Sequence, residues 1–255
     1  MRASVDRRLL ERRSAVRRAE GRDRLRRLSW GAALAGLLAV AVGAFFSPLL
    51  DVDAVRVTGG ARTGEAAILE ALGIGPGKAM VLVDSTAAAE AVMRLPWVER
   101  AEVDRDWPGT VLVSVDERRP EVAVPSPDGR FTLVDGVGRE LAAVDQPGPG
   151  VPVLEGMAVE PRPGSVLEEA KGALAVVAAL PPSVSGRLAR LSVREDGVIL
   201  AVRADGENEA EVVLGPPTDL PAKVLALATL LEEADLVNLR TVDLRVPAAP
   251  VLTRG

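Results

Sequence analysis

Three residue types are missing from this chain of 255 residues, which contains no cysteine, no histidine and no tyrosine. Without cysteine no disulfide can form, so any folded domain must be held together by packing alone. Without histidine and cysteine, neither a Ser-His or Cys-His nucleophile nor a His/Cys metal cage can be assembled. Lysine is scarce, and a Ser-Lys catalytic pair could use only Lys78, Lys171 or Lys223.

The remaining route to catalysis is a pair of carboxylates. Candidate aspartates fall in predicted turns and on the polar faces of predicted strands, where a solvent-exposed role is the default; they are Asp84, Asp104, Asp106 and Asp116. We therefore expect no enzymatic activity, no cofactor, no metal and no small-molecule substrate. Aromatic residues make up 2% of the chain, so its cores must be aliphatic.

Charge is absent from one long stretch of the chain. No charged residue occurs between Arg27 and Asp51, and the 23 residues 28–50 read LSWGAALAGLLAVAVGAFFSPLL. At 1.5 Å of rise per residue, a helix of this length reaches about 35 Å, enough to cross the ~30 Å hydrocarbon layer of a membrane. The sequence therefore predicts a single transmembrane helix at 28–50.

The 27 residues before this run are strongly basic, with eleven arginines against four acidic residues. Arginine next to a membrane span stays on the cytoplasmic side, so we expect a cytoplasmic tail at 1–27 and the bulk of the chain outside the plasma membrane. Nucleic acid is a poorer partner for this tail, which lies against a membrane and has no aromatic residue before Trp30.

A cleavable signal peptide is the alternative interpretation of the N-terminal region. Ala39-Val40-Ala41 has the small-x-small form that a signal peptidase accepts. The apolar run is longer than the usual 7–15 residues of a signal peptide, and the basic segment before it is also long. These two features favour a retained anchor.

The segment 51–119 shows a β-α-α-β-β pattern. Alternating residues predict strands at 52–58, 98–105 and 110–116, while apolar residues at helical spacing predict helices at 63–73 and 85–95. Thr63 is a plausible N-cap and Gly73 a plausible end of the first helix. The glycine-rich loop at 73–79 lacks the residues of a phosphate-binding loop, because Leu72 and Ala79 stand at two of its fixed positions.

The segment 120–255 predicts a mixed sheet with two helices, which makes the chain an α+β protein. Ser165 and Glu168 form a capping box before the first of these helices, and Thr218 precedes the second. The strands are expected at 121–124, 131–134, 139–142, 188–193, 198–203, 210–214 and 239–246.

The strand at 239–246 is the candidate functional element. Pro247 and Pro250 follow it and disfavour a further ladder, so no later element is expected to cover it if it lies at the sheet rim. A rim strand exposes N–H and C=O groups that an extended partner can pair with. An interior strand paired on both sides fits the sequence equally well. The candidate partner-binding residues are Thr241, Val242, Asp243, Leu244, Arg245 and Val246.

Three further stretches carry a resemblance to a known family. They are Pro96-Trp97-Val98 with the strand that follows, Arg105-Asp106-Trp107-Pro108, and Glu117-Arg118-Arg119-Pro120. Together with the basic tail and the apolar run, they resemble the bacterial cell-division proteins of the FtsQ/DivIB family. The motif residues on which this resemblance depends are Pro96, Val98, Arg105, Trp107 and Pro108.

The resemblance implies a polypeptide-transport-associated (POTRA) domain at 51–119 and a β domain at 120–255. It places a domain junction at Glu117, Arg118 and Pro120, although a strand end with solvated charges explains these residues equally well.

The resemblance also implies a non-enzymatic protein of the division septum that supports septal peptidoglycan synthesis. Its partners would be FtsB-like and FtsL-like single-span proteins and other divisome membrane proteins. By position, an FtsB-like strand would pair at 241–246. A POTRA-type chaperone for secreted or envelope polypeptides is the competing hypothesis.

Overall fold

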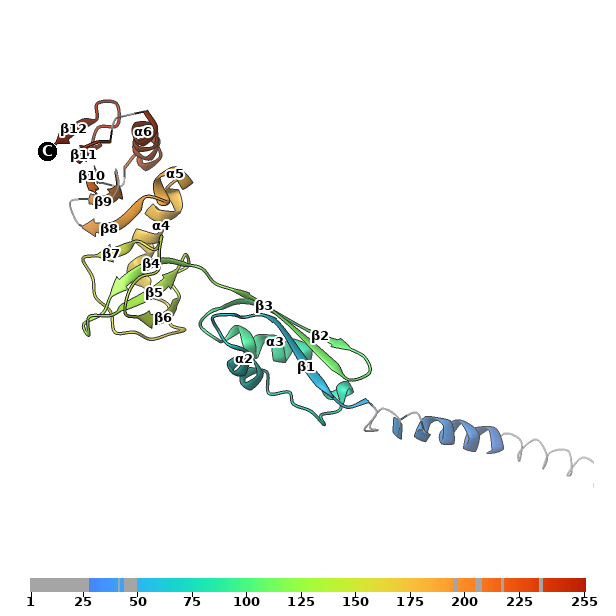
Figure 1. Cartoon of the computed structure of the whole chain (residues 1–255). Coiled ribbons are helices and arrows are strands. Elements are labelled where there is room, and N and C mark those ends of the chain that lie inside the picture. The colour runs from blue at the N-terminus through green and yellow to red at the C-terminus, as the bar shows by residue number, and fades with distance from the viewer. Residues whose placement is uncertain are drawn as a thin grey trace, which may run out of the picture. The chain divides into compact units, whose positions relative to one another are not determined.

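The computed structural model describes residues 28–40, 42–43, 50–194, 197–204, 208–216, 218–233 and 236–255, and Figure 1 shows its elements. The predicted tail at 1–27 lies outside the described residues, as do positions 41 and 44–49 of the predicted span. Residues 28–40 and 42–43 are helical. Among the described residues, no helix has both the length and the hydropathy that a membrane crossing requires. The transmembrane helix therefore stays a prediction.

The chain divides into two compact units. One comprises Met1–Arg56, Ile74–Ser85 and Asp104–Leu112, and the other comprises Val57–Gly73, Thr86–Val103 and Val113–Gly255. The domain boundaries expected from the sequence, 51–119 and 120–255, stay a prediction.

The first sheet has three strands in the order β1-β3-β2. Its strands are β1 (Ala54–Gly59), β2 (Val98–Asp106) and β3 (Thr110–Glu117), and its helices are α2 (Glu65–Leu72), α3 (Ser85–Met93) and the short 3₁₀ helix η2 (Met80–Leu82). On β3, Val111, Val113 and Val115 are buried while the residues between them are exposed, so this strand has one covered face. The element order confirms the predicted β-α-α-β-β pattern.

Two glycines and one threonine explain local details of this region. Gly73 ends α2 in the left-handed conformation with φ 60°, as predicted. The predicted N-cap at Thr63 is wrong, because Gly64 occupies that position and the Thr63 hydroxyl donates to Glu117 Oε1 at 2.8 Å instead. Gly59 has φ 82°, and a Cβ there would collide with the carbonyl oxygen of Val115. Only glycine fits at this close approach.

The second sheet has nine strands in the order β12-β11-β10-β9-β8-β7-β4-β5-β6. The strands are β4 (Pro120–Pro125), β5 (Phe131–Asp135), β6 (Glu140–Val144), β7 (Val153–Glu155), β8 (Leu188–Arg194), β9 (Gly197–Arg203), β10 (Glu209–Gly215), β11 (Leu239–Asp243) and β12 (Val251–Arg254). Three strand pairs are parallel, namely β4/β7, β7/β8 and β10/β11, which confirms the predicted mixed sheet.

The helices of this region differ in detail from the prediction. They are η3 (Glu168–Ala170), α4 (Lys171–Ala179), α5 (Pro182–Ser185) and α6 (Leu220–Glu233). The predicted capping box at Ser165 and Glu168 is wrong, because the Ser165 hydroxyl donates to Glu140 Oε1 at 2.7 Å and α4 starts only at Lys171. Pro182 begins the short helix α5, where a proline in the first turn loses no hydrogen bond.

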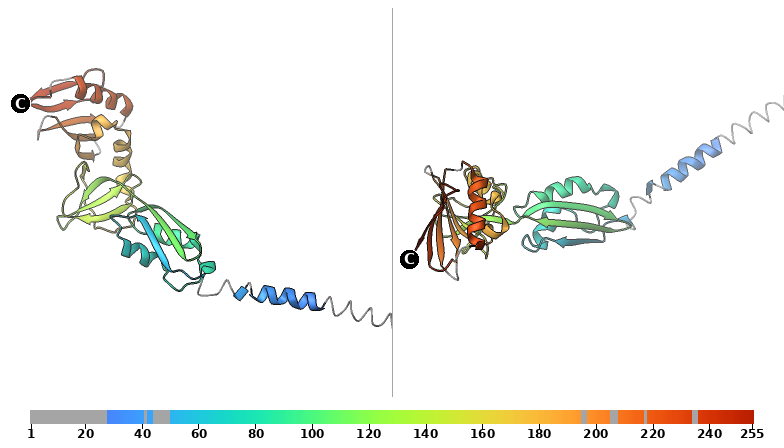
Figure 2. Two further views of the ribbon diagram at one scale, coloured as in Figure 1. Left: turned by 45° about the vertical axis from the view of Figure 1, so that its right-hand side comes forward. Right: turned by 90° about the horizontal axis from the view of Figure 1, so that it is seen from above.

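The main core lies between the nine-stranded sheet and its helices. Figures 1 and 2 show α4, α5 and α6 together on one side of this sheet. Leu174 and Val177 of α4 and Leu227 of α6 belong to the same buried cluster as Leu191 and Leu200 of the sheet. This covered face fixes which side of each strand points inward.

Candidate partner-binding site

The strand predicted to bind a partner is paired on both of its sides. β11 pairs in parallel with β10, where Thr241 lies opposite Glu211, and in antiparallel fashion with β12, where Thr241 lies opposite Thr253. The expectation that no later element would cover this strand is therefore wrong.

The two prolines do not prevent a further strand because they stand in the turn before it. The regular strand β11 ends at Asp243, and Ala249 N donates to Val246 O at 3.1 Å in the reversal that follows. The chain then pairs again over Val251–Arg254, a segment that contains no proline. Proline within a ladder removes a donor, whereas proline in a turn costs no ladder bond.

The six predicted residues separate into buried supports and an exposed turn. Val242 and Leu244 are fully buried in the main core. Asp243 and Arg245 form an ion pair, in which Arg245 Nε donates to Asp243 Oδ2 at 3.0 Å. These hydrogen bonds and that of the Arg245 backbone N–H lower the pKa of Asp243, and the carboxylate raises the pKa of Arg245. Val246 is exposed at the start of the turn.

β12 is the edge strand of the nine-stranded sheet. It ends the sheet order, and within the described chain no strand pairs with its outer side. All four of its residues are exposed, with Val251 at 61% and Leu252 at 39%. Gly255 N donates to Asn238 O at 3.0 Å, which extends the contact between the two strands past Arg254. The edge that an added strand would use thus belongs to β12.

An apolar hollow adjoins this edge. One wall is a face of α6 with Leu225, Ala226 and Leu230, and the other is the turn before β12 with Pro247 and Pro250. The hollow has a volume of 740 Å³, and Leu225 is 68% exposed within it. Exposed apolar side chains grouped in this way mark surfaces that bind other proteins.

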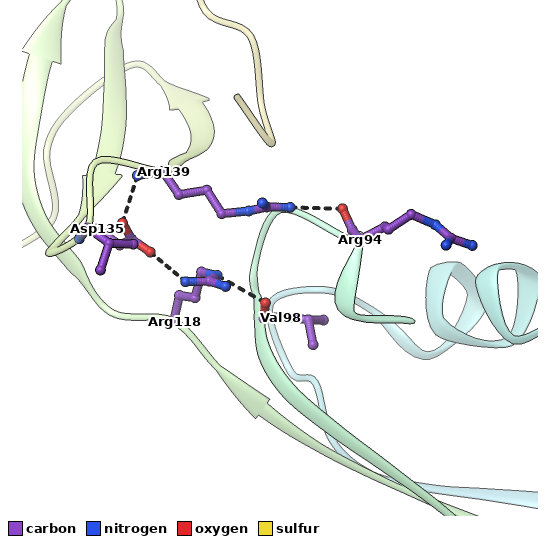
Figure 3. A network of polar contacts seen from close by, with 6 residues as sticks. Arg94, Val98, Arg118, Asp135 and Arg139 are labelled. Carbon is purple, nitrogen blue, oxygen red and sulfur yellow. Dashed lines mark hydrogen bonds and ion pairs between the residues drawn. The ribbon is translucent and has the colours of Figure 1, made fainter. Parts of the chain in front are cut away.

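The predicted junction residues make specific contacts. Arg118 donates from its backbone N to Trp97 O at 2.8 Å, from Nε to Val98 O at 3.0 Å and from Nη1 to Asp135 Oδ2 at 2.8 Å (Figure 3). The Arg118 and Asp135 side chains are only 18% and 6% exposed. Arg118 therefore joins the end of the first sheet to β5 and is not a solvated strand end.

Asp135 is the shared acceptor of this network, and sequence reasoning missed it. Its Oδ1 accepts the backbone N–H of Arg139 at 2.7 Å, and Arg139 Nη2 donates onward to Arg94 O at 3.0 Å (Figure 3). Glu117 faces the other way and accepts the backbone N–H groups of Arg62 and Thr63. Pro120, the third predicted junction residue, opens β4 opposite Asp135.

The family-motif residues lie on β2 and next to its two ends. Val98 is fully buried at the start of β2 and Pro96 is half-buried just before it. Arg105 is exposed near the end of β2, and Trp107 is 47% exposed in the following turn, where the peptide bond to Pro108 is cis. The motif therefore marks the beginning and end of one strand rather than a single cluster.

Trp97 packs against apolar residues within the larger compact unit. It contacts a small second cluster formed by Ala123, Leu133 and Leu141 on the face of the nine-stranded sheet opposite the main core. The guanidinium carbon of Arg62 lies 5.1 Å from the Trp97 ring centroid. Trp97 therefore has a packing role.

Two family models match the chain. The POTRA domain of FtsQ type matches residues 50–118, and the C-terminal domain of cell division protein FtsQ/DivIB matches residues 123–245. "Cell division protein FtsQ" of Streptomyces collinus is 33% identical over 244 residues, which cover 91% of this chain and 90% of that protein. The chain belongs to the FtsQ/DivIB family.

Other relatives carry the same name. The FtsQ of Mycolicibacterium smegmatis is 33% identical over 89% of this chain, and the alignment spans 65% of that longer protein. The extracytoplasmic domain of DivIB from Geobacillus stearothermophilus, a solved structure, is 21% identical over 47% of this chain with a TM-score of 0.29. The C-terminal family model ends at residue 245, so β12 lies beyond the residues that this model matches.

Proposed function

We propose that this chain is a membrane-anchored, non-enzymatic division protein that captures an extended segment of another division protein on the outer edge of β12. The observation that carries the proposal is the open edge itself. β12 ends a nine-stranded sheet, its residues are exposed, and an apolar hollow lies beside the turn that leads into it. Edge strands of this kind accept an added strand through backbone hydrogen bonds.

Family membership and the predicted anchor support the choice of partner. Residues 28–50 hold the chain in the plasma membrane with the tail 1–27 in the cytoplasm. The partners are FtsB-like and FtsL-like single-span proteins at the septum, and their capture supports septal peptidoglycan synthesis. Thr241, Val242 and Asp243 support the edge strand from inside the sheet, because they pair directly with β12.

The affinity of such a contact is moderate. Each added backbone hydrogen bond contributes about 0.5–1.5 kcal/mol net, and β12 offers four residues. Ordering a flexible partner segment opposes binding. Two proteins tethered to the same membrane meet at a raised effective concentration, which offsets this cost.

A proline scan along β12 tests strand capture. In an antiparallel edge strand, alternate residues point their backbone groups toward β11 and outward. The variants Val251→Pro, Leu252→Pro and Thr253→Pro should therefore fall into two classes, because residue 252 points its backbone groups the opposite way from 251 and 253. The class whose N–H group points outward should lose the partner and keep normal stability. The same substitution at Ala143 on β6, at the opposite end of the sheet, is the matched control. If all three β12 variants co-purify with the partner as wild type does, strand capture is wrong.

The chaperone hypothesis uses a different edge. The order β1-β3-β2 leaves β1 and β2 at the rims of the first sheet, where unfolded envelope polypeptides could pair. It predicts unselective peptide binding that survives the β12 substitutions and a fluorescent fusion without enrichment at midcell. Midcell enrichment together with loss of the partner in one of the two classes supports the division role.

A further inference from the structure

Three apolar side chains of the smaller compact unit are exposed. Leu82 is 60% exposed, Trp107 is 47% exposed and Val81 is 38% exposed. Val81 and Leu82 belong to η2, and Trp107 stands in the turn between β2 and β3. We refer to these three residues as the apolar rim.

The apolar rim is carried by η2 and by the turn between β2 and β3. Backbone hydrogen bonds join both segments to the residues that directly follow the apolar run. Val52 N donates to Lys78 O at 2.8 Å, and Asp51 forms an isolated bridge with Ala79, the residue before η2. Asp53 N donates to Gly109 O at 2.7 Å. Figures 1 and 2 show the start of β1 and the β2–β3 turn at the same end of the three-stranded sheet.

Gly109 makes this attachment possible. A Cβ at this position would meet the carboxylate of Asp53 and lie 2.9 Å from Asp51 O. The turn therefore packs directly against residues 51–53 with no side chain in between. Leu82 N donates to Ala79 O at 2.9 Å, which keeps η2 folded back beside the same segment.

Chain length then places the rim next to a membrane. The predicted span ends at Leu50, and Asp53 lies three residues further, at most about 10 Å along an extended chain. Both loops are attached within that distance, and no linker is available to carry them away. We propose that Val81, Leu82 and Trp107 insert into the interface of the lipid bilayer and so dock this end of the domain on the membrane. The inference depends on the anchor at 28–50 that the proposed function includes.

The side chains of the apolar rim suit the headgroup region of a lipid bilayer. Tryptophan concentrates at membrane–water interfaces because its ring is apolar and its N–H is polar. Asp106 directly precedes Trp107, and Asp51 and Asp53 stand in the segment to which both loops are bonded, so these acidic residues favour a shallow contact. Apolar burial therefore drives the insertion, and vesicles of neutral phosphatidylcholine are sufficient for it.

The test uses the full chain in phosphatidylcholine vesicles whose lipids carry bromine at defined depths. The double variant Trp30→Phe, Trp97→Phe leaves Trp107 as the single tryptophan, and Trp30→Phe, Trp107→Phe leaves the half-buried Trp97 as the matched control. We expect lipids brominated near the headgroup to quench Trp107 several-fold more than the control, and more than lipids brominated deep in the chains do. Equal quenching of the two variants overturns the proposal.

A second reporter covers η2. Because the chain has no cysteine, Leu82→Cys gives one attachment site for a polarity-sensitive dye, and Val137→Cys in the exposed turn after β5 is the control. When vesicles are present, we expect the emission of the dye at position 82 to shift as it does in an apolar environment. The emission of the dye at position 137 should not shift. No shift at 82 counts against insertion even if a tryptophan variant fails to fold.

The anchor and the inference fail in different ways. If alkaline carbonate removes the chain from the vesicles, the anchor is wrong and the inference falls with it. If the chain stays anchored while Trp107 is unquenched, only the inference is overturned. If Trp107 is open to iodide in vesicles but shielded in native membranes, a protein partner covers the rim and the lipid proposal is overturned.

Discussion

The two edges of the nine-stranded sheet are built in opposite ways. At the β6 edge, the loop 164–167 folds onto the strand, with Glu140 N donating to Ser165 O at 2.9 Å and Gly164 N donating to Glu140 O at 2.7 Å. At the β12 edge, no element of the described chain occupies the outer side.

The closed edge is reinforced from within. The Glu140 carboxylate is buried, and it accepts the Arg162 backbone N–H at 2.6 Å and the Ser165 hydroxyl at 2.7 Å. β12, by contrast, has no inward-pointing acid or proline at Val251, Leu252 or Thr253, the devices that commonly protect an exposed edge. The loop thus covers the start of the β6 edge, while no described element covers the outer side of β12. This difference supports partner capture at β12.

Opening the closed edge should have the largest effect. Glu140→Ala removes the buried carboxylate that accepts two hydrogen bonds from the loop at the start of β6. We expect the free energy of unfolding to fall by about 2 kcal/mol, measured by denaturant titration. The variant should also self-associate more readily because an edge becomes available.

The control for this change is Glu155→Ala. Glu155 pairs with Arg190 at 3.3 Å, and both side chains are largely exposed, so the loss should stay below about 0.5 kcal/mol. An unfolding midpoint for Glu140→Ala equal to that of Glu155→Ala would show that the carboxylate does not hold the β6 edge closed.

Much of the fold was predictable because its signals are local. The alternation of Val111, Val113 and Val115 located a strand, and the position of Gly73 located a helix end. β7 was not predicted because it has only three residues and pairs in parallel with β4 and β8, which are distant in sequence. Short parallel strands carry no periodicity that a single sequence reveals.

The predicted strand 239–246 is only partly confirmed. Residues 241–243 lie in β11, whereas 244–246 lie beyond its end, and Pro247 and Pro250 precede a further strand, β12. The run Val251-Leu252-Thr253 after Pro250 was a usable strand signal. Glu140 and Asp135 could not be found, because burial of an acid depends on donors that tertiary folding brings to it.

The apolar hollow beside β12 should have a smaller effect, on binding alone. Leu225→Ala removes an exposed side chain, so stability should change by less than about 0.5 kcal/mol. If the bound partner covers the hollow, its affinity should fall about fivefold, or roughly 1 kcal/mol, in a direct binding titration. Leu112→Ala, on the exposed side of β3, is the matched control. Equal affinity of the two variants would confine the interface to the strand edge.

The smallest effect concerns the turn between β11 and β12. Because Arg245 lowers the pKa of Asp243, the ionised carboxylate is favoured in the folded chain. Its contribution is complete above the ordinary value of 3.8 and is lost as the pH falls through the lower folded value. Asp243→Asn should therefore reduce amide-exchange protection of Leu252 slightly at neutral pH and leave it equal to wild type in strong acid. A difference that persists in strong acid would mean that Asp243 supports β12 by packing rather than by charge.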